Sequence, residues 1–254
     1  MALNLHTLLV GRVRPETAAE LARELGVPTP EGGWGRALQL GGPADLTAYL
    51  EKVAASYPLL ATPRALERAA YEATVDAAAA GQVYLELRFG PATHVESARQ
   101  LEDAIAAVGE GVSAGASESG IVGTVVVAAL RHHDEETNCA VARAAAKRAG
   151  TVTGFDLAGD ELRFPRLEPF QNPFAIARSA ALGITCHAAE AGPAHSIVDA
   201  VDLLGATRIG HGTQLIQDPE ITRWAVAEGV VVEACVTSNF FTGCVRTVEE
   251  HPIS

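Results

Sequence analysis

Short apolar runs alternate with longer amphipathic runs along the whole chain of 254 residues. The short runs are rich in Val, Ile and Leu and have strand length; they cover residues 3–9, 83–89, 121–130, 152–156, 184–187, 208–210 and 230–234. The longer runs have helical spacing and cover residues 15–25, 63–80, 97–117, 135–149, 174–182, 196–204 and 219–228. Strands that alternate with helices of this length predict βαβ units and a parallel sheet.

The fold that fits this order is an α/β fold, a (β/α)8 TIM-type barrel. It forms one domain over residues 1–254 with a helical insertion at about 26–80. An open, doubly wound sheet is the alternative, but no Gly-x-Gly-x-x-Gly follows the first strand, which argues against dinucleotide binding. The eighth strand of a barrel is missing from the pattern. We therefore expect either residues beyond 254 or another element to close the gap.

Charge and cysteine content narrow the class of protein. The 19 basic and 31 acidic residues give a net charge of −12, which argues against nucleic acid or an anionic membrane as a partner. The four cysteines show no Cys-x-x-Cys spacing, so we expect reduced thiols. No signal-peptide pattern and no apolar stretch of membrane-spanning length occurs, and the expected location is the cytoplasm.

Ionisable residues follow two neighbouring strands at the point where each strand ends. His187 and Glu190 follow one strand, and His211 between two glycines follows the next. In a barrel of parallel strands the carboxyl ends meet at one rim, where catalytic groups converge. Two imidazoles and a carboxyl group there can hold a metal, deliver a proton and polarise a water molecule.

Six ordered motifs resemble the adenosine deaminase family of metal-dependent amidohydrolases over essentially the whole chain. They are Gly11-Arg12-Val13-Arg14-Pro15-Glu16-Thr17, Tyr84-Leu85-Glu86-Leu87-Arg88-Phe89, Gly154-Phe155-Asp156-Leu157-Ala158-Gly159-Asp160-Glu161, His187-Ala188-Ala189-Glu190, Gly210-His211-Gly212, and Cys235-Val236-Thr237-Ser238-Asn239 with Thr242-Gly243. The resemblance implies a hydrolase that deaminates an aminopurine nucleoside or a related amino-heterocycle, a small-molecule substrate. It also implies a zinc-activated hydroxide in a pocket at the carboxyl end of the barrel.

The resemblance assigns roles to single residues. His187 and His6 would be zinc ligands, Glu190 the proton shuttle to the purine, and His211 the group that orients the attacking hydroxide. The substrate would contact the residues Gly159, Asp160, Ser238 and Asn239.

Departures from the family pattern concern the metal. Leu8 stands where the family has its second histidine, and Val10 stands where it has an aspartate that binds the sugar. The family's last ligand, an aspartate after the eighth strand, is absent from these residues. With Leu8 in place of a ligand, His6 and His187 alone form an incomplete zinc site, since catalytic zinc takes three protein ligands.

Two other functions stay open at this point. Leu8 and Val10 give the pocket an apolar floor, which suits a metal-independent enzyme using Glu190 and His211 for cyclisation, elimination or isomerisation. A non-catalytic binding protein is the third reading. A homo-oligomer is left open. His94, His195 and His251 are expected to have no role, whereas His132 and His133, which follow the third strand, form either a solvated loop, the favoured reading, or a loop that reaches the pocket.

Overall fold

The computed structural model describes residues 2–95 and 97–253. The chain divides into two compact units that alternate along the sequence. The first unit holds residues 1–41, 51–127 and 144–153, and the second holds residues 42–50, 128–143 and 154–254. The single domain expected over residues 1–254 stays a prediction.

Seven strands occur in the described part of the chain, and their order in the sheet follows their order in the sequence, β1 to β7. The strands are β1 Ala2–Leu8, β2 Gln82–Phe89, β3 Val122–Leu130, β4 Val152–Ala158, β5 Gly183–Ala188, β6 Arg208–His211 and β7 Val231–Glu233. The pairs β1–β2 and β2–β3 are parallel, as are β4–β5, β5–β6 and β6–β7. All seven predicted strands are confirmed, each within two residues at either end.

Ten α-helices lie between and after these strands in the described residues. They are α1 Pro15–Leu25, α2 Gly33–Leu38, α3 Leu46–Ala54, α4 Pro63–Ala79, α5 Ala98–Ser119, α6 Glu135–Ala146, α7 Gln171–Ser179, α8 His195–Leu204, α9 Pro219–Ala227 and α10 Val236–Phe241. No helix in these described segments is long and apolar enough for a membrane span. Helices α2, α3 and α4 lie within residues 26–80, before the second strand, and their description as an insertion stays a prediction.

Residues that begin helices in the sequence also cap them in the structure. Thr62 accepts a hydrogen bond from the Ala65 amide, 3.2 Å away, directly before a proline that starts α4. The Asp218 carboxylate accepts bonds from the first amides of α9, ahead of Pro219. Such caps satisfy amides that the helix leaves unpaired, and proline at the first position has none to lose.

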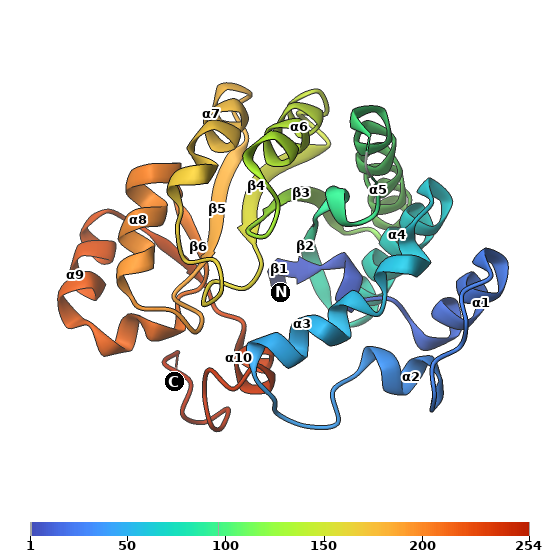
Figure 1. Ribbon diagram of the computed structural model, residues 1–254, viewed down its shortest axis with the longest axis horizontal. Coiled ribbons are helices and arrows are strands. Elements are labelled where there is room, and N and C mark those ends of the chain that lie inside the picture. The colour runs from blue at the N-terminus through green and yellow to red at the C-terminus, as the bar shows by residue number, and fades with distance from the viewer. Residues whose placement is uncertain (1, 96, 254) are drawn as a thin grey trace. The chain divides into compact units, whose positions relative to one another are not determined.

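In the first unit, α4 and α5 lie side by side (Figure 1). Their close approach depends on glycine, because a Cβ at Gly111 of α5 would overlap the backbone carbonyl oxygen of Glu67 in α4. A Cβ at Gly115, one turn later, would lie 2.9 Å from the carbonyl oxygen of Tyr71. Backbone atoms cannot rotate out of the way as a side chain can. The two helices therefore need both glycines.

The variant Gly111→Ala is expected to lower the free energy of unfolding by about 1–3 kcal/mol, since the helices must separate. Gly35→Ala in α2 is the matched control. Nothing lies within 4 Å of a Cβ built there, so the alanine is expected to stabilise by about 0.5–1 kcal/mol. Urea unfolding of both variants measures the two values. A neutral Gly111→Ala would contradict the packing described for α4 and α5.

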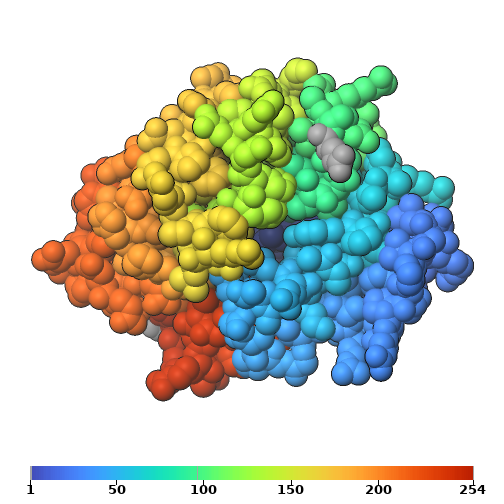
Figure 2. Space-filling model, in the orientation of Figure 1, coloured from blue at the N-terminus to red at the C-terminus, as the bar shows by residue number. Residues whose placement is uncertain are grey.

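In the second unit, the parallel strands β4 to β7 alternate with α7, α8 and α9 (Figure 1). Phe155 of β4 and Phe174 of α7 are fully buried and pack edge to face, with ring centroids 5.0 Å apart. At the surface, the red carboxyl-terminal segment lies beside the blue segment near residue 45 (Figure 2), where the Ala44 amide donates to the Phe241 carbonyl oxygen. This unit carries most of the residues singled out in the sequence.

Three elements differ from expectation. Helix α6 ends at Ala146, three residues before its predicted end. Helix α7 begins and ends three residues earlier than predicted, because Ala181 takes a left-handed conformation, with φ of 59°, that ends the helical run. The short helix α10 was not predicted, since its residues were recognised only as a motif. None of the four cysteines forms a disulfide in the described part of the chain.

Candidate active site

His187 and His211 stand at the carboxyl ends of two adjacent strands, β5 and β6. In the parallel register His187 is opposite Gly210, and Ala188 is opposite His211. Side chains one step apart normally face opposite sides of a strand, but His211 has a φ of 71°, which turns the backbone where the strand ends. Positive φ is strained for a residue with a side chain, and such strain concentrates at functional sites.

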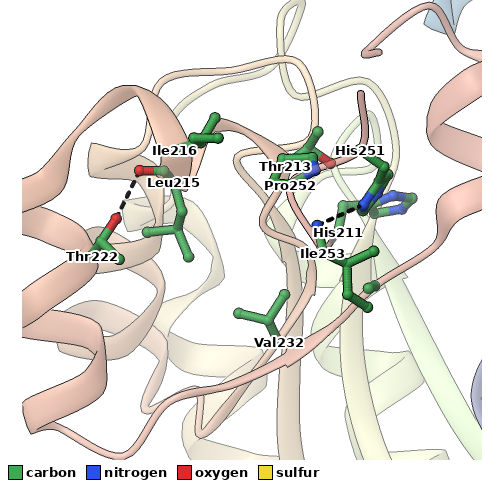
Figure 3. Close-up of a pocket in the computed structure, with 10 residues that line it drawn as sticks. His211, Thr213, Leu215, Ile216, Thr222, Val232, His251, Pro252 and Ile253 are labelled. Carbon is green, nitrogen blue, oxygen red and sulfur yellow. Dashed lines mark hydrogen bonds between the residues drawn. The ribbon is translucent and has the colours of Figure 1, made fainter. Parts of the chain in front are cut away.

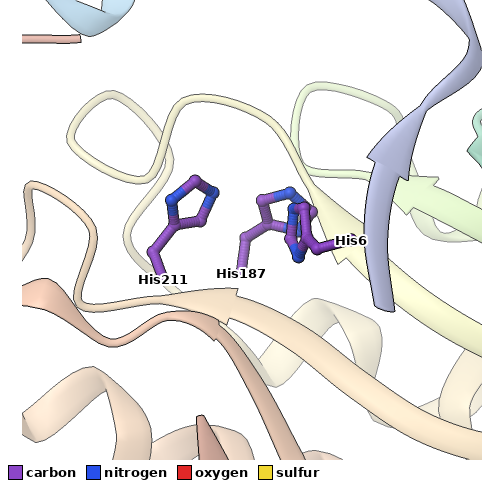
Figure 4. Close-up of side chains that lie close together, drawn as sticks. All are labelled: His6, His187 and His211. Atoms are coloured by element: carbon purple, nitrogen blue, oxygen red, sulfur yellow. The ribbon is translucent and has the colours of Figure 1, made fainter. Parts of the chain in front are cut away.

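The two imidazole rings consequently point toward the same space (Figure 4). Their ring centroids are 5.2 Å apart, and one nitrogen of each ring lies within 4.8 Å of the other. Both side chains are buried, with residue exposures of 8% and 4%. The spacing allows a water molecule or a small ion to contact both rings.

Residues of β4 and of the segment after β3 hold the side chain and the backbone of His187 in place. Oδ2 of Asp156, which is fully buried, lies 2.9 Å from Nδ1 of His187. The guanidinium of Arg131, at the end of β3, donates a hydrogen bond of 2.8 Å to the His187 carbonyl oxygen and another of 3.0 Å to that of Phe164. A carboxylate at Nδ1 fixes the ring orientation and increases the basicity of the other nitrogen. Ring and backbone of His187 are thus both held.

Glu190 lies in the turn after β5 and is 5% exposed. Its Oε1 is 3.5 Å from Nδ1 of His211 and accepts a hydrogen bond of 3.3 Å from the Thr242 hydroxyl. The turn is held by Glu161, whose Oε1 accepts bonds of 2.5 and 2.7 Å from the amides of Ala191 and Gly192. The Glu190 carboxyl group therefore has a defined position beside His211.

Burial raises the pKa of Glu190 to about 7. His187 acts in the opposite direction, while the negative charges of Glu161 and Asp160 raise the pKa further. Desolvation disfavours the charged carboxylate, and nearby carboxylates repel it. Glu190 is consequently balanced between its acid and base forms near neutral pH, as a proton-transfer group requires.

A hydrogen-bonded chain starts at Nδ1 of His211, the same nitrogen that Glu190 approaches. Nδ2 of Asn239, in α10, lies 2.9 Å from Nδ1 of His211. Oδ1 of the same amide lies 3.1 Å from Nε2 of His251, which is buried at 4% exposure. His251 belongs to none of the sequence motifs, and for that reason no role was expected for it.

The other predicted substrate contacts are Gly159, Asp160 and Ser238. Gly159 has a φ of 115°, which residues with a side chain rarely adopt, and a Cβ there would lie 3.4 Å from Arg131. Asp160 is occupied by its own loop: Oδ1 accepts from the amides of Leu162 and Arg163. Ser238 hydrogen-bonds Tyr49 of α3. Contact between any of them and substrate stays a prediction.

Sequence reasoning missed Tyr49, Arg131 and Asp156. Burial raises the pKa of Tyr49, and the charge of Glu190 raises it further, so its hydroxyl lies within electrostatic reach of the carboxyl group. Arg131 and Asp156 stand at or near strand ends, and that position could have identified them. Tyr49 comes from the helical insertion, where the sequence has no such regular position.

An apolar cavity of about 390 Å³ borders this side of the site (Figure 3). His211 and His251 form part of its wall, with aliphatic residues such as Val232, Leu215 and Ile253. Aliphatic side chains therefore lie next to the hydrogen-bonded chain that joins the two imidazoles.

His6 belongs to the first unit. It lies in β1, near the carboxyl end of the strand, and is half-buried. Its amide donates to Oδ1 of Asn4, 3.2 Å away.

Comparison with known proteins defines the class. The family described as adenosine deaminase matches residues 2–254. The chain is 35% identical to an adenosine deaminase of Enterococcus faecalis, covering 98% of this chain and 75% of that protein. It is also 35% identical to an adenosine deaminase of Shewanella loihica, covering 99% of this chain and 77% of that protein.

Solved structures agree with these relatives. An adenine deaminase from Arthrobacter aurescens superposes with a TM-score of 0.89 at 25% identity, covering 99% of this chain and 76% of that one. A zinc-bound amidohydrolase from Burkholderia ambifaria gives 0.87 at 28% identity, covering 99% of this chain and 70% of that one. The chain therefore has the (β/α)-barrel fold of amidohydrolases, with seven strands in the described residues. It belongs to the adenosine deaminase family, whose members are hydrolytic deaminases acting on C–N bonds.

Proposed function

We propose that this protein hydrolyses the exocyclic C–N bond of an aminopurine nucleoside, with adenosine as the reference substrate. Water adds at C6 of the purine, the amino group leaves as ammonia, and inosine forms. The observation that carries the proposal is the buried Glu190 carboxyl group, with a pKa of about 7, directly beside His211 in a member of this family.

In this proposal Glu190 delivers a proton to N1 of the purine ring. Protonation draws electron density from C6 and makes that carbon more electrophilic. The hydrogen bond from Thr242 and the clamp of Glu161 on the following amides keep the carboxyl group in place during the transfer. His211 orients the attacking water by hydrogen bonding, and Gly159, Asp160, Ser238 and Asn239 form the proposed contacts to the substrate.

The proposed metal ligands are His187 and, from β1, His6. The donor set at His187 fits a metal, since a carboxylate at Nδ1 leaves Nε2 as the ligand atom, a pairing common to metal-binding histidines. A zinc ion, when bound, supplies Lewis acidity that activates a water molecule as the nucleophile. Leu8 has no donor atom, so we expect weaker metal affinity than three protein ligands would provide.

The test is release of ammonia from adenosine, adenine and adenosine 5′-monophosphate by the purified protein. We expect ammonia and inosine in equal amounts from adenosine. No release from any of the three, by protein supplied with zinc, would exclude the proposal. Turnover of a non-nucleoside substrate after complete chelation would favour a metal-independent enzyme instead.

The pH dependence of kcat/KM should report Glu190. A proton donor must be protonated, so activity is expected to fall about tenfold per pH unit above about 7. Glu161→Gln removes a charge that raises this pKa but keeps an oxygen for the two amides. The inflection should move to lower pH, and it should not move in the control Glu168→Gln, an exposed carboxylate. An unchanged profile in Glu161→Gln would contradict the assignment.

A further inference from the structure

We propose that His251 is a positioning residue that acts through Asn239 and holds His211 in the neutral tautomer with its proton on Nε2. The two histidines and the amide form one continuous hydrogen-bonded chain within the second unit. The chain ends at a backbone amide, and that end determines the direction of every bond in it.

The direction starts at Ile253. Its backbone N–H lies 3.2 Å from Nδ1 of His251, and the bond is marked in Figure 3. A backbone N–H can only donate, so Nδ1 of His251 must accept. Burial lowers the pKa of His251, which keeps the ring neutral. A neutral imidazole with an accepting Nδ1 carries its proton on Nε2.

The second bond orients the Asn239 side chain. The Nε2–H of His251 donates to Oδ1 of Asn239 across 3.1 Å. The amide NH₂ group is therefore the end that faces His211, 2.9 Å from Nδ1. The donor on one side leaves a single consistent orientation for the amide. Asn239 is fully buried, so no solvent competes for either end.

The third bond assigns the tautomer of His211. An amide NH₂ only donates, so Nδ1 of His211 must accept, and the ring proton lies on Nε2. Protonating Nδ1 would set an N–H against the NH₂ of Asn239 inside a buried chain. The Asn239 NH₂ group, 2.9 Å from Nδ1, is closer to this nitrogen than Oε1 of Glu190 at 3.5 Å, so the arrangement disfavours the other neutral tautomer.

The catalytic consequence rests on the proposed function, whereas the tautomer itself does not. With Nε2 protonated, His211 offers a hydrogen-bond donor to the reaction rather than a lone pair. A donor fixed in advance stabilises negative charge as it develops on the attacking oxygen. This tautomer also gives the two residues different roles. Glu190 transfers the proton, and the Nε2–H of His211 donates a hydrogen bond to the attacking oxygen.

The direct test is the ¹⁵N NMR spectrum of the protein with labelled histidine, because protonated and lone-pair imidazole nitrogens have well-separated shifts. The His211→Gln variant identifies the signals of His211 by their loss. We expect a lone-pair nitrogen at Nδ1 and a protonated one at Nε2 in both His211 and His251. A protonated Nδ1 in His211 would overturn the proposal, and this reading needs no substrate.

Variants test the connection between the residues. Asn239→Asp replaces the NH₂ donor by an acceptor, so the proton of His211 should move to Nδ1. His251→Leu removes the donor to Asn239 and should lower kcat by about 10- to 100-fold, the usual effect of removing an outer-shell partner. His251→Gln can still donate and should recover most of kcat, with KM changed less than about threefold throughout.

His195→Leu is the matched control, because His195 is exposed in α8 and contacts only Asp199 in the described interactions. It should leave the NMR signals of His211 and kcat unchanged. If His251→Leu folds and its His211 signals match those of the wild type, His251 does not set the tautomer. If the wild-type spectrum is as expected but adenosine is not turned over, the proposed function is wrong. The assignment of the His211 tautomer is then still supported.

Discussion

Glu190→Gln is expected to lower kcat on adenosine by about two to four orders of magnitude, the usual effect of removing a general acid or base. The amide has nearly the same size and can still meet the Thr242 hydroxyl, 3.3 Å from Oε1, but it cannot transfer a proton. KM should change little, since the contacts of the bound purine remain. Steady-state kinetics measures both values, and thermal unfolding checks that the fold persists.

Two comparisons sharpen this result. Thr242→Val removes only the hydroxyl that supports Glu190 and should cost less than about tenfold, as for a single neutral hydrogen bond. Glu220→Gln, an exposed position in α9, should have no effect. A Glu190→Gln enzyme within tenfold of the wild type would remove Glu190 from the reaction.

His187→Ala is expected to abolish deamination and to remove the bound metal together with it. The Asp156 carboxylate lies 2.9 Å from Nδ1 of this imidazole, a pairing that is common in histidines that bind metals. Asp156→Asn should weaken metal affinity by about 10- to 100-fold while leaving the ligand present. Elemental analysis of each protein, alongside the ammonia assay, measures both effects.

Chelation of the wild type provides the same test without a mutation. Activity should disappear on chelation and return with zinc, and His195→Ala should behave as the wild type. Full activity in a metal-free preparation would contradict the proposed ligands and would favour the metal-independent alternative.

The sequence predicted the strands and the grouping of His187, Glu190 and His211 for one physical reason. Parallel strands deliver their carboxyl ends to a common edge, so residues just past adjacent strands meet wherever the register is regular. The structure brings these three side chains together at β5 and β6. Their chemical roles remain proposals, because proximity alone assigns no reaction.

The supporting residues could not be predicted in the same way. His251 reaches Asn239 because of the path of an irregular segment after α10, and no periodicity encodes that path. Tyr49 comes from the helical insertion and meets Ser238 from nearly 190 positions away in sequence. Arg131 directly follows the third strand, so the strand-end argument applies to it, but its neighbours His132 and His133 favoured a solvated loop at this point.

Oxygen transfer from water tests the central claim most directly. The purified protein with zinc is incubated with adenosine in water enriched in ¹⁸O. The molecular mass of the product is then measured by mass spectrometry. Hydrolytic deamination predicts inosine that carries one ¹⁸O at C6 and one equivalent of ammonia. Adenosine recovered unchanged, or a product without ¹⁸O, would contradict it.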